Sequence, residues 1–260
     1  MSMEVQTQSS IPEIMPDRKR YSVIAYHIPG LSANDLFPKC EDPAVKELLQ
    51  YRPENPDAPD QIQTVGITSI LHGEDTAIVE SCGISLKVLK NAIKFGLPQD
   101  REVQVLEKAT CFVGPDYIFG IGHSGVIQHT VNSLANHVFD CAISPVDLND
   151  LPTGMQALPT SAVDRLSAVT SITIKNSSET EVRQATLRGK DIEQYLGYNV
   201  VNKAHHEVLR LAGVLKTDNY GNLKITFSKN GRFAFSWALS MPIDFLVFKQ
   251  IFHRLTGVAG

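Results

Sequence analysis

Apolar and polar residues alternate along residues 168–174, and a two-residue period is typical of half-buried β-strands. Residues 21–28 are rich in β-branched and aromatic residues, and further strands are expected over residues 64–71, 76–82, 208–216, 222–228 and 232–239. Two or three further short strands are expected through residues 102–117 and 118–121. The pattern predicts a protein built mainly from β-strands.

Polar turns separate the last three predicted strands. Residues 218–221 (Asp-Asn-Tyr-Gly) and residues 229–231 (Lys-Asn-Gly) lie between them. Asn and Gly adopt positive φ angles at little cost, as tight hairpin turns require. We therefore expect antiparallel hairpins in this part of the chain.

Helical periodicity is confined to short segments. Leu86, Leu89 and Ile93 form one stripe in residues 85–95, and Gly96 follows as a stop signal. Further helices are predicted over residues 125–138, 190–198 and 244–255, with a short helical pattern at residues 45–51 inside a proline-rich loop at 38–59. The helices are too few and short to dominate the fold.

Together these elements predict a β-rich α+β fold with two domains. Residues 1–20 are polar and read as a flexible N-terminal arm. We expect a β-rich N-terminal domain over residues 21–150 and a β-rich C-terminal domain with a basic surface over residues 163–260. Pro, Gly and Asp are frequent between them, so residues 151–162 are predicted to be a linker.

Composition is that of a globular protein, with 43% hydrophobic and 20% charged residues among 260. No apolar run approaches the roughly 20 residues of a membrane-spanning helix. The first 16 residues have neither a basic start nor an apolar stretch, so a secretory signal is not expected. The four cysteines are widely spaced and are expected to be reduced and half-buried: Cys40, Cys82, Cys111 and Cys141.

Charge is distributed unevenly along the chain. Residues 1–150 hold 11 Lys and Arg against 20 Asp and Glu, whereas residues 151–260 hold 13 against 8. Residues 219–243 contain no acid at all. This asymmetry favours an anion-binding surface in the second half, although a chance distribution over a solvated surface is the alternative.

The basic residues of the second half are the main candidate site. If they share one face, each cation near an anionic leaflet contributes about 1 kcal/mol. The candidates for membrane or anion binding are Lys203, Arg210, Lys224, Lys229, Arg232, Lys249 and Arg254. A secondary basic face is expected on the predicted helix 85–95, from Lys87, Lys90 and Lys94.

Nucleic acid is the rival anionic partner. The aromatic residues near the basic candidates alternate as the inward face of a strand: Phe227, Phe233, Phe235 and Trp237. Such residues are expected in a core and not in a base-stacking platform. No specific nucleic acid partner is therefore predicted.

An enzyme is the second alternative. Gly120, Gly122 and Gly125 match GxGxxG after an apolar strand and before a helix, with Asp140 about 20 residues further on. A doubly wound sheet would need a run of βαβ units, which the hairpin-rich second half lacks. Nucleotide binding is thus a weak alternative, since glycines at a strand-to-helix turn also have a structural use. No catalytic residue, metal site or cofactor is predicted.

Several segments, taken in order, carry a resemblance to a known family. Residues 135–138 (Ala-Asn-His-Val) precede residues 143–148 (Ile-Ser-Pro-Val-Asp-Leu), and Leu158-Pro159 leads into the strand at 168–174. Residues 212–215 (Ala-Gly-Val-Leu) then precede the turn at 218–221. This order resembles the matrix proteins of non-segmented negative-strand RNA viruses, of the paramyxovirus and pneumovirus type.

The resemblance implies two flattened β-sandwich-like domains with short helices. It implies homodimers that build a higher-order sheet on anionic phospholipid, with contacts to the viral nucleocapsid and to glycoprotein tails during assembly and budding. The location would be the virion, at the inner face of the envelope, and the host cytoplasm and inner leaflet of the plasma membrane. Another β-rich viral structural or movement protein is the remaining alternative.

Overall fold

The computed structural model describes residues 3–50, 62–94, 97–141, 143, 145–146, 166–176, 184–189, 206–228 and 230–256. Its contacts divide the chain into two compact units. The first unit comprises residues 1–12 and 28–143, and the second comprises residues 13–27 and 144–260. The second unit is therefore built from two separate stretches of the chain.

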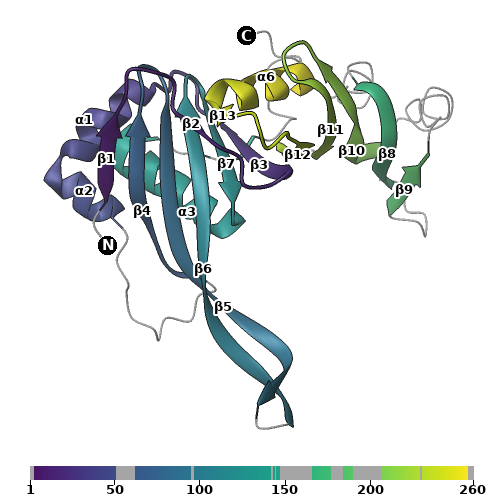
Figure 1. Ribbon diagram of the computed structural model, residues 1–260, viewed down its shortest axis with the longest axis horizontal. Helices are drawn as coiled ribbons and strands as arrows, with labels where there is room; N and C mark the ends of the chain where they lie inside the picture. The colour runs from purple at the N-terminus through teal and green to yellow at the C-terminus, as the bar shows by residue number, and fades with distance from the viewer. Residues whose placement is uncertain are drawn as a thin grey trace. The chain divides into compact units, whose positions relative to one another are not determined.

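The predicted β-rich α+β class is confirmed, because strands form most of the described chain and the helices are few and short. The finer expectation of sandwich-like domains is not confirmed. In the described residues of each unit, one large sheet carries a helix against one face (Figure 1). The predicted helix at 190–198 and linker at 151–162 lie outside the described residues.

Five strands form the sheet of the first unit in the order β1-β4-β5-β6-β7. Their bounds are Glu4–Thr7, Ile62–His72, Ala77–Lys94, Leu97–Gly114 and Tyr117–Gly122. β1 pairs parallel to β4, and the other pairs are antiparallel. The expected flexible arm thus differs from the structure, because residues 4–7 are a paired strand and Met3 is buried.

Helix α3 (Ser124–Leu134) covers this sheet and continues into the π-helical turn η2 (Ala135–Phe139), as the sequence predicts. It contacts β4, β5, β6 and β7. Thr130 Oγ1 is hydrogen-bonded to Ser81 Oγ at 2.7 Å, which ties the helix to the sheet within the core. The shorter elements η1 (Ala33–Asp35), α1 (Leu36–Glu41) and α2 (Pro43–Leu49) complete the unit, so part of the expected loop at 38–59 is helical.

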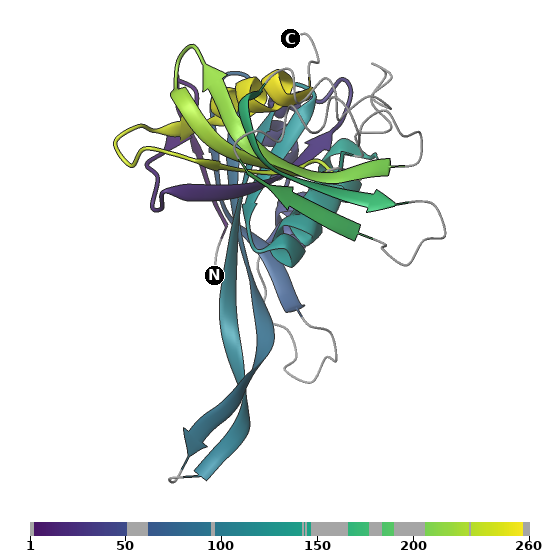
Figure 2. The same cartoon turned by 90° about the vertical axis from the view of Figure 1, so that its right-hand side faces the viewer.

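The predicted helix at 85–95 is wrong, since residues 85–94 continue strand β5. β4 pairs with β5 only as far as Ser85, and β7 pairs with β6 only over residues 109–114. Beyond those points β5 and β6 pair only with each other among the described residues, and residues 86–94 with 97–106 are hereafter the ribbon. Figures 1 and 2 show this twisted ribbon extending past the other strands of its sheet.

Six strands form the sheet of the second unit in the order β3-β12-β11-β10-β8-β9, all in antiparallel pairs. Their bounds are Arg20–His27, Arg232–Ser236, Gly221–Ser228, His206–Thr217, Leu166–Asn176 and Gln184–Arg188. A small second ladder pairs β2 (Glu13–Ile14) with β13 (Ile243–Asp244). The hairpins predicted around residues 218–221 and 229–231 are both present.

One face of this sheet packs on helix α6 (Phe245–Thr256), which confirms the predicted terminal helix. Phe248 lies edge-on to Phe235 with ring centroids 5.9 Å apart, and Phe252 lies 5.9 Å from Phe233. Phe227 and Trp237 are also buried, so the predicted inward aromatic face is confirmed. The opposite face of the sheet is free of α6 and is hereafter the outer face.

Candidate anion-binding surface

Alternation along the strands determines which charged residues reach the outer face. In β11, Leu223, Ile225 and Phe227 are buried, so the intervening residues point outward. Lys224 is one of these intervening residues, and it is exposed.

Residues directly opposite each other in a ladder share a face. Arg210 stands opposite Ser228, which has the same orientation as Lys224. Arg232 lies two residues before Ala234, the partner of outward-facing Thr226. Arg210, Lys224 and Arg232 therefore lie together on the outer face, and all three are exposed.

Three further cations join them, and the sequence analysis did not include them in the candidate set. Arg20 of β3 stands opposite Ser236, Lys216 of β10 opposite Asn222, and Arg188 of β9 opposite Ser171. All three are exposed and outward. We call the whole set the basic face: Arg20, Arg188, Arg210, Lys216, Lys224 and Arg232. The pairing register of the strands places Arg20, Arg188 and Lys216 on this face. Register can be known only once the neighbouring strands are known.

Acids are absent from the outward positions of this sheet whose side chains the structure describes. Glu207 stands in register with Lys175 near the far end of β10. The basic face therefore has a local positive charge even though the whole chain has a net charge of −4.

Two shallow hollows on the basic face combine cations with hydroxyl groups. A hollow of about 400 Å³ is lined by Arg20 and Lys224 together with Thr170, Thr226 and Ser236 among others. A second hollow of about 540 Å³ is lined by Arg188 and Arg210 with several Ser and Thr residues. Guanidinium, ammonium and hydroxyl donors suit the oxygen atoms of phosphate or carboxylate groups.

The remaining candidates of the second half lie elsewhere. Lys249 and Arg254 belong to α6, which packs on the opposite side of the sheet through Phe248 and Phe252. The condition that the candidate cations share one face is therefore not met by these two residues. Lys203 and Lys229 fall outside the described residues.

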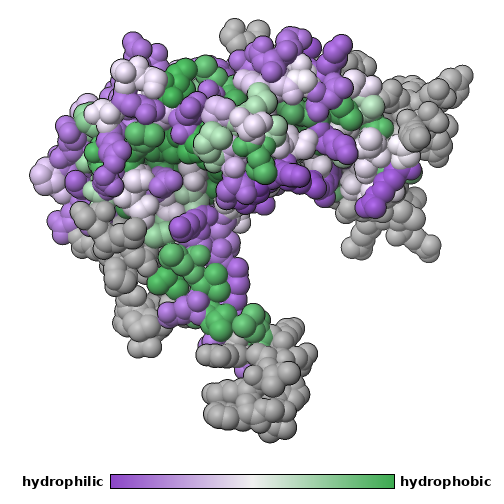
Figure 3. All heavy atoms as spheres, viewed as in Figure 1, coloured by the Kyte–Doolittle hydropathy of each residue, from purple (hydrophilic) through white to green (hydrophobic). Residues whose placement is uncertain are grey.

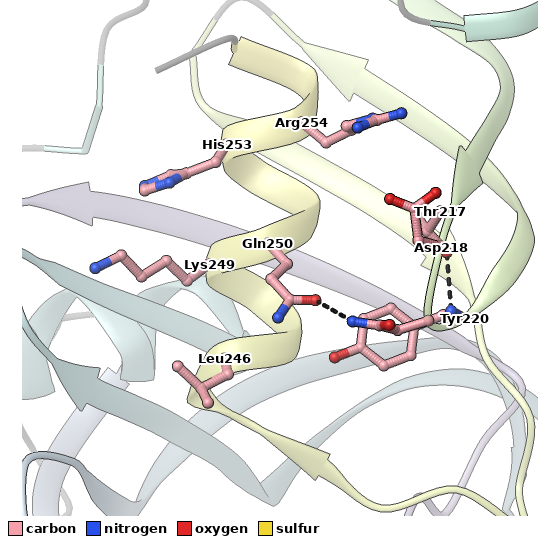
Figure 4. Close-up of a pocket in the computed structure, with 9 residues that line it drawn as sticks. Thr217, Asp218, Tyr220, Leu246, Lys249, Gln250, His253 and Arg254 are labelled. Atoms are coloured by element: carbon pink, nitrogen blue, oxygen red, sulfur yellow. Dashed lines mark hydrogen bonds between the residues drawn. The ribbon is translucent and has the colours of Figure 1, made fainter. Parts of the chain in front are cut away.

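Lys249 and Arg254 line a separate pocket of about 600 Å³ between α6 and the turn at residues 217–220 (Figure 4). Asn219 Nδ2 of the turn donates a hydrogen bond to Gln250 Oε1 of the helix at 3.4 Å. Arg254 points toward the turn, whereas Lys249 points away from it (Figure 4). These two cations therefore do not converge on one anion.

Of the predicted secondary basic face, only the Lys87 side chain belongs to the part of the chain whose side chains the structure describes, and those of Lys90 and Lys94 lie outside it. Lys87 forms an ion pair with Glu107 across the hairpin. The hydrogen bond from Lys87 holds the pKa of the Glu107 carboxyl below its ordinary value, helped by the Ser85 hydroxyl at 3.1 Å.

The glycine motif has a packing role. A Cβ on Gly120 would lie 2.4 Å from Ile127 Cγ2 of α3, and one on Gly122 would lie 2.3 Å from the carbonyl oxygen of Lys108. Gly125 lies within the first turn of α3. Strand β7 runs antiparallel to β6, whereas a dinucleotide-binding βαβ unit needs parallel strands. This geometry gives no support to nucleotide binding at the three glycines.

Burial disfavours thiolate chemistry at two of the cysteines. It raises the pKa of the Cys40 and Cys111 thiols to about 12. Cys82 is also buried and Cys141 is half-buried, and all four thiols are free. A nucleophilic cysteine needs the opposite shift of its pKa.

The sequence was also compared with known proteins. No protein-family model matches the chain, and no curated protein matches it. The basic face is therefore interpreted from its own chemistry.

Two further features bear on the kinds of site present. Among the described residues, no group of three or more His, Cys, Asp and Glu side chains converges as a metal site would require. None of the helices described is long and apolar enough to span a bilayer.

Proposed function

We propose that this protein is a viral matrix-type structural protein whose second unit binds anionic membranes through the basic face. One observation carries the proposal, namely six exposed cations on a single sheet face whose described outward positions hold no acid. Such a face can contact a charged plane with many residues at once.

The energy available is sufficient for peripheral binding. Each Lys or Arg near an anionic leaflet contributes about 1 kcal/mol, so six contribute up to about 6 kcal/mol. The hollows add Ser and Thr hydroxyls that can donate to headgroup oxygens. Binding should weaken with salt, because the screening length shortens to about 8 Å at physiological ionic strength.

A lipid surface is favoured over single-stranded nucleic acid. Single-strand binding surfaces combine cations with exposed aromatic rings that stack on bases. The outward positions described on this sheet present no exposed aromatic side chain. Sequence resemblance to matrix proteins supports the same choice, and it extends the proposal to self-assembly under the viral envelope with nucleocapsid and glycoprotein tails as partners.

Charge reversal on the two sides of the sheet tests the membrane contact. The variant K224E/R232E should lose binding to phosphatidylserine vesicles by about thirtyfold or more, because two attractions of about 1 kcal/mol each become repulsions. Co-sedimentation with vesicles at low and physiological salt measures this.

The matched control is K249E/R254E, which changes the net charge equally on the α6 side. We expect it to bind within a few-fold of the wild type. If the control loses binding and K224E/R232E does not, the basic face is not the membrane contact. Tighter binding to RNA than to vesicles would favour the nucleic-acid alternative.

A further inference from the structure

The ribbon has an outer edge on β6 that no described strand pairs. β7 pairs with β6 up to Ala109, and His123 N then donates to the carbonyl oxygen of Lys108 at 3.0 Å. Because N–H and C=O groups alternate in direction along a strand, the even-numbered residues of β6 point their backbone groups to this edge, as Lys108 does. Glu102, Gln104 and Leu106 therefore offer backbone donors and acceptors at the edge.

The sequence of this edge is complementary to itself when read in the opposite direction. An antiparallel copy centred on Gln104 places Val103 opposite Val105, and it places Arg101 opposite Glu107. Even residues then face even residues, so the outward backbone groups meet and form hydrogen-bonded pairs. Hydrogen-bond direction, the Arg101–Glu107 pairs and the Val103–Val105 pairs favour this centre, although Glu102 then stands opposite Leu106.

Other residues of β6 placed at the centre of the antiparallel pair give less favourable contacts. A centre at Glu102 brings two carboxylates together, and a centre at Val105 places Val103 opposite Glu107. The latter would also place Glu102 opposite Lys108, whose carbonyl already accepts from His123. A centre at Val103 leaves Arg101 opposite Val105, without a charge partner.

Exposed aliphatic side chains concentrate on the ribbon. Leu86, Val88 and Leu106 are 37%, 52% and 56% exposed, and the pairing of β5 with β6 puts them on one face. Figure 3 shows a hydrophobic patch where the ribbon leaves the rest of the sheet. Isolated two-stranded ribbons are marginally stable in water, and exposed apolar patches mark interaction sites.

We propose that two copies of this chain pair edge to edge through β6, with Gln104 on the two-fold axis. The product is a four-stranded antiparallel sheet, β5-β6-β6-β5, and the contact is isologous as two-fold symmetry requires. Leu86, Val88 and Leu106 of both ribbons share one face of this sheet, and Val103 and Val105 of both copies meet on the other. This deepens the self-assembly part of the proposed function by naming its contact, and it does not depend on membrane binding.

Cysteine cross-linking tests the register. In a hydrogen-bonded antiparallel pair the Cα atoms are about 5.5 Å apart, within the range a disulfide spans. Q104C should therefore cross-link to its own copy in the full chain under mild oxidation, and E102C, on the same strand and face, should not. Cross-linking of a cysteine at 103 or 105 in place of 104 would overturn the register, and cross-linking at none of 102–106 would overturn the contact.

Complementary charge reversal tests the pairing by sedimentation. R101E places two Glu side chains opposite each other at both ends, and E107R places two Arg side chains there, so each variant alone should dimerise about tenfold more weakly. Mixing the two variants restores both opposite-charge pairs in a heterodimer, which should form more tightly than either homodimer even though E107R also removes the ion pair with Lys87. A merely structural effect of either substitution would persist in the mixture, and that result would refute the proposal.

Q104P separates this contact from the membrane contact. Its missing N–H points away from β5, so the ribbon ladder keeps its hydrogen bonds while the outer edge is blocked. We expect monomers that still bind phosphatidylserine vesicles through the basic face. Wild-type protein that stays monomeric up to about 100 μM, well above the Kd of specific interfaces, would overturn the inference.

Discussion

Gly122 illustrates how one residue type can serve packing where a ligand motif is expected. Its φ angle is 115°, and a Cβ would meet the carbonyl oxygen of Lys108 at 2.3 Å. Only glycine accepts both conditions, because L-residues avoid this φ range and a backbone oxygen cannot move aside. The turn from β7 into α3 depends on it.

G122A should therefore lower the free energy of unfolding by about 2 kcal/mol or more, through backbone strain and overpacking together. Urea denaturation measures the change. The control is G221A, where φ is 68° but no atom lies within 4 Å of the added Cβ, so only about 1 kcal/mol of backbone strain is expected. Equal losses would show that the contact with Lys108 contributes nothing.

For single residues, the sequence predicts which side chains are buried better than it predicts which side chains lie on the same face of a sheet. Alternation correctly assigned Phe233 and Phe235 to the core and left Lys224 and Arg232 outward. It could not find Arg188, because the outward position of a residue on a sheet edge depends on register with strands distant in sequence.

At the scale of elements, the ribbon shows where local periodicity misleads. Leu86, Leu89 and Ile93 fit a helical stripe, yet the segment also contains Val88 and Ile93, β-branched residues that favour strands. Pairing with residues 97–106 decides the outcome, and it is a tertiary interaction that a single segment does not encode. By contrast, α3 and α6 were predicted correctly because their apolar stripes are buried against a sheet.

Helix α6 contributes to stability through one side only. F248A should destabilise the second unit by about 3–5 kcal/mol, because the fully buried ring packs edge-on against Phe235. The control L246A removes a side chain that is 39% exposed on the same helix and should cost less than about 1 kcal/mol. Denaturant unfolding followed by tryptophan fluorescence reports on this region, because Trp237 lies 5.7 Å from Phe235.

For the whole molecule, the chain does not divide at a single point. Composition predicted one boundary near residue 150, but residues 13–27 belong to the unit that residues 144–260 complete. The sequence pattern predicted that β3 is a strand but not which strand pairs with it, since strand order is a property of the assembled sheet. The placement of β3 beside β12 is therefore a finding that the sequence alone did not contain.

A fragment of residues 144–260 should consequently fold poorly by itself. It lacks β3, whose Tyr21 and Val23 are buried opposite Phe235 and Phe233. Adding a synthetic peptide of residues 13–27 should raise its melting temperature, whereas a V23D peptide should not, because a buried charge opposes pairing. Thermal unfolding by circular dichroism tests this, and a fragment that is equally stable with and without the peptide would contradict it.

The split second unit also sets the order of events on the ribosome. Residues 28–231 lie between β3 and the strand that pairs with it. At typical synthesis rates of about 5–20 residues per second, β3 waits roughly 10–40 s before β12 is made. During that interval every residue of the first unit, 1–12 and 28–143, has been synthesised, whereas β3 still lacks its partner β12 in the second unit. Synonymous codons that slow translation after residue 143 would lengthen this wait and should lower the yield of folded protein.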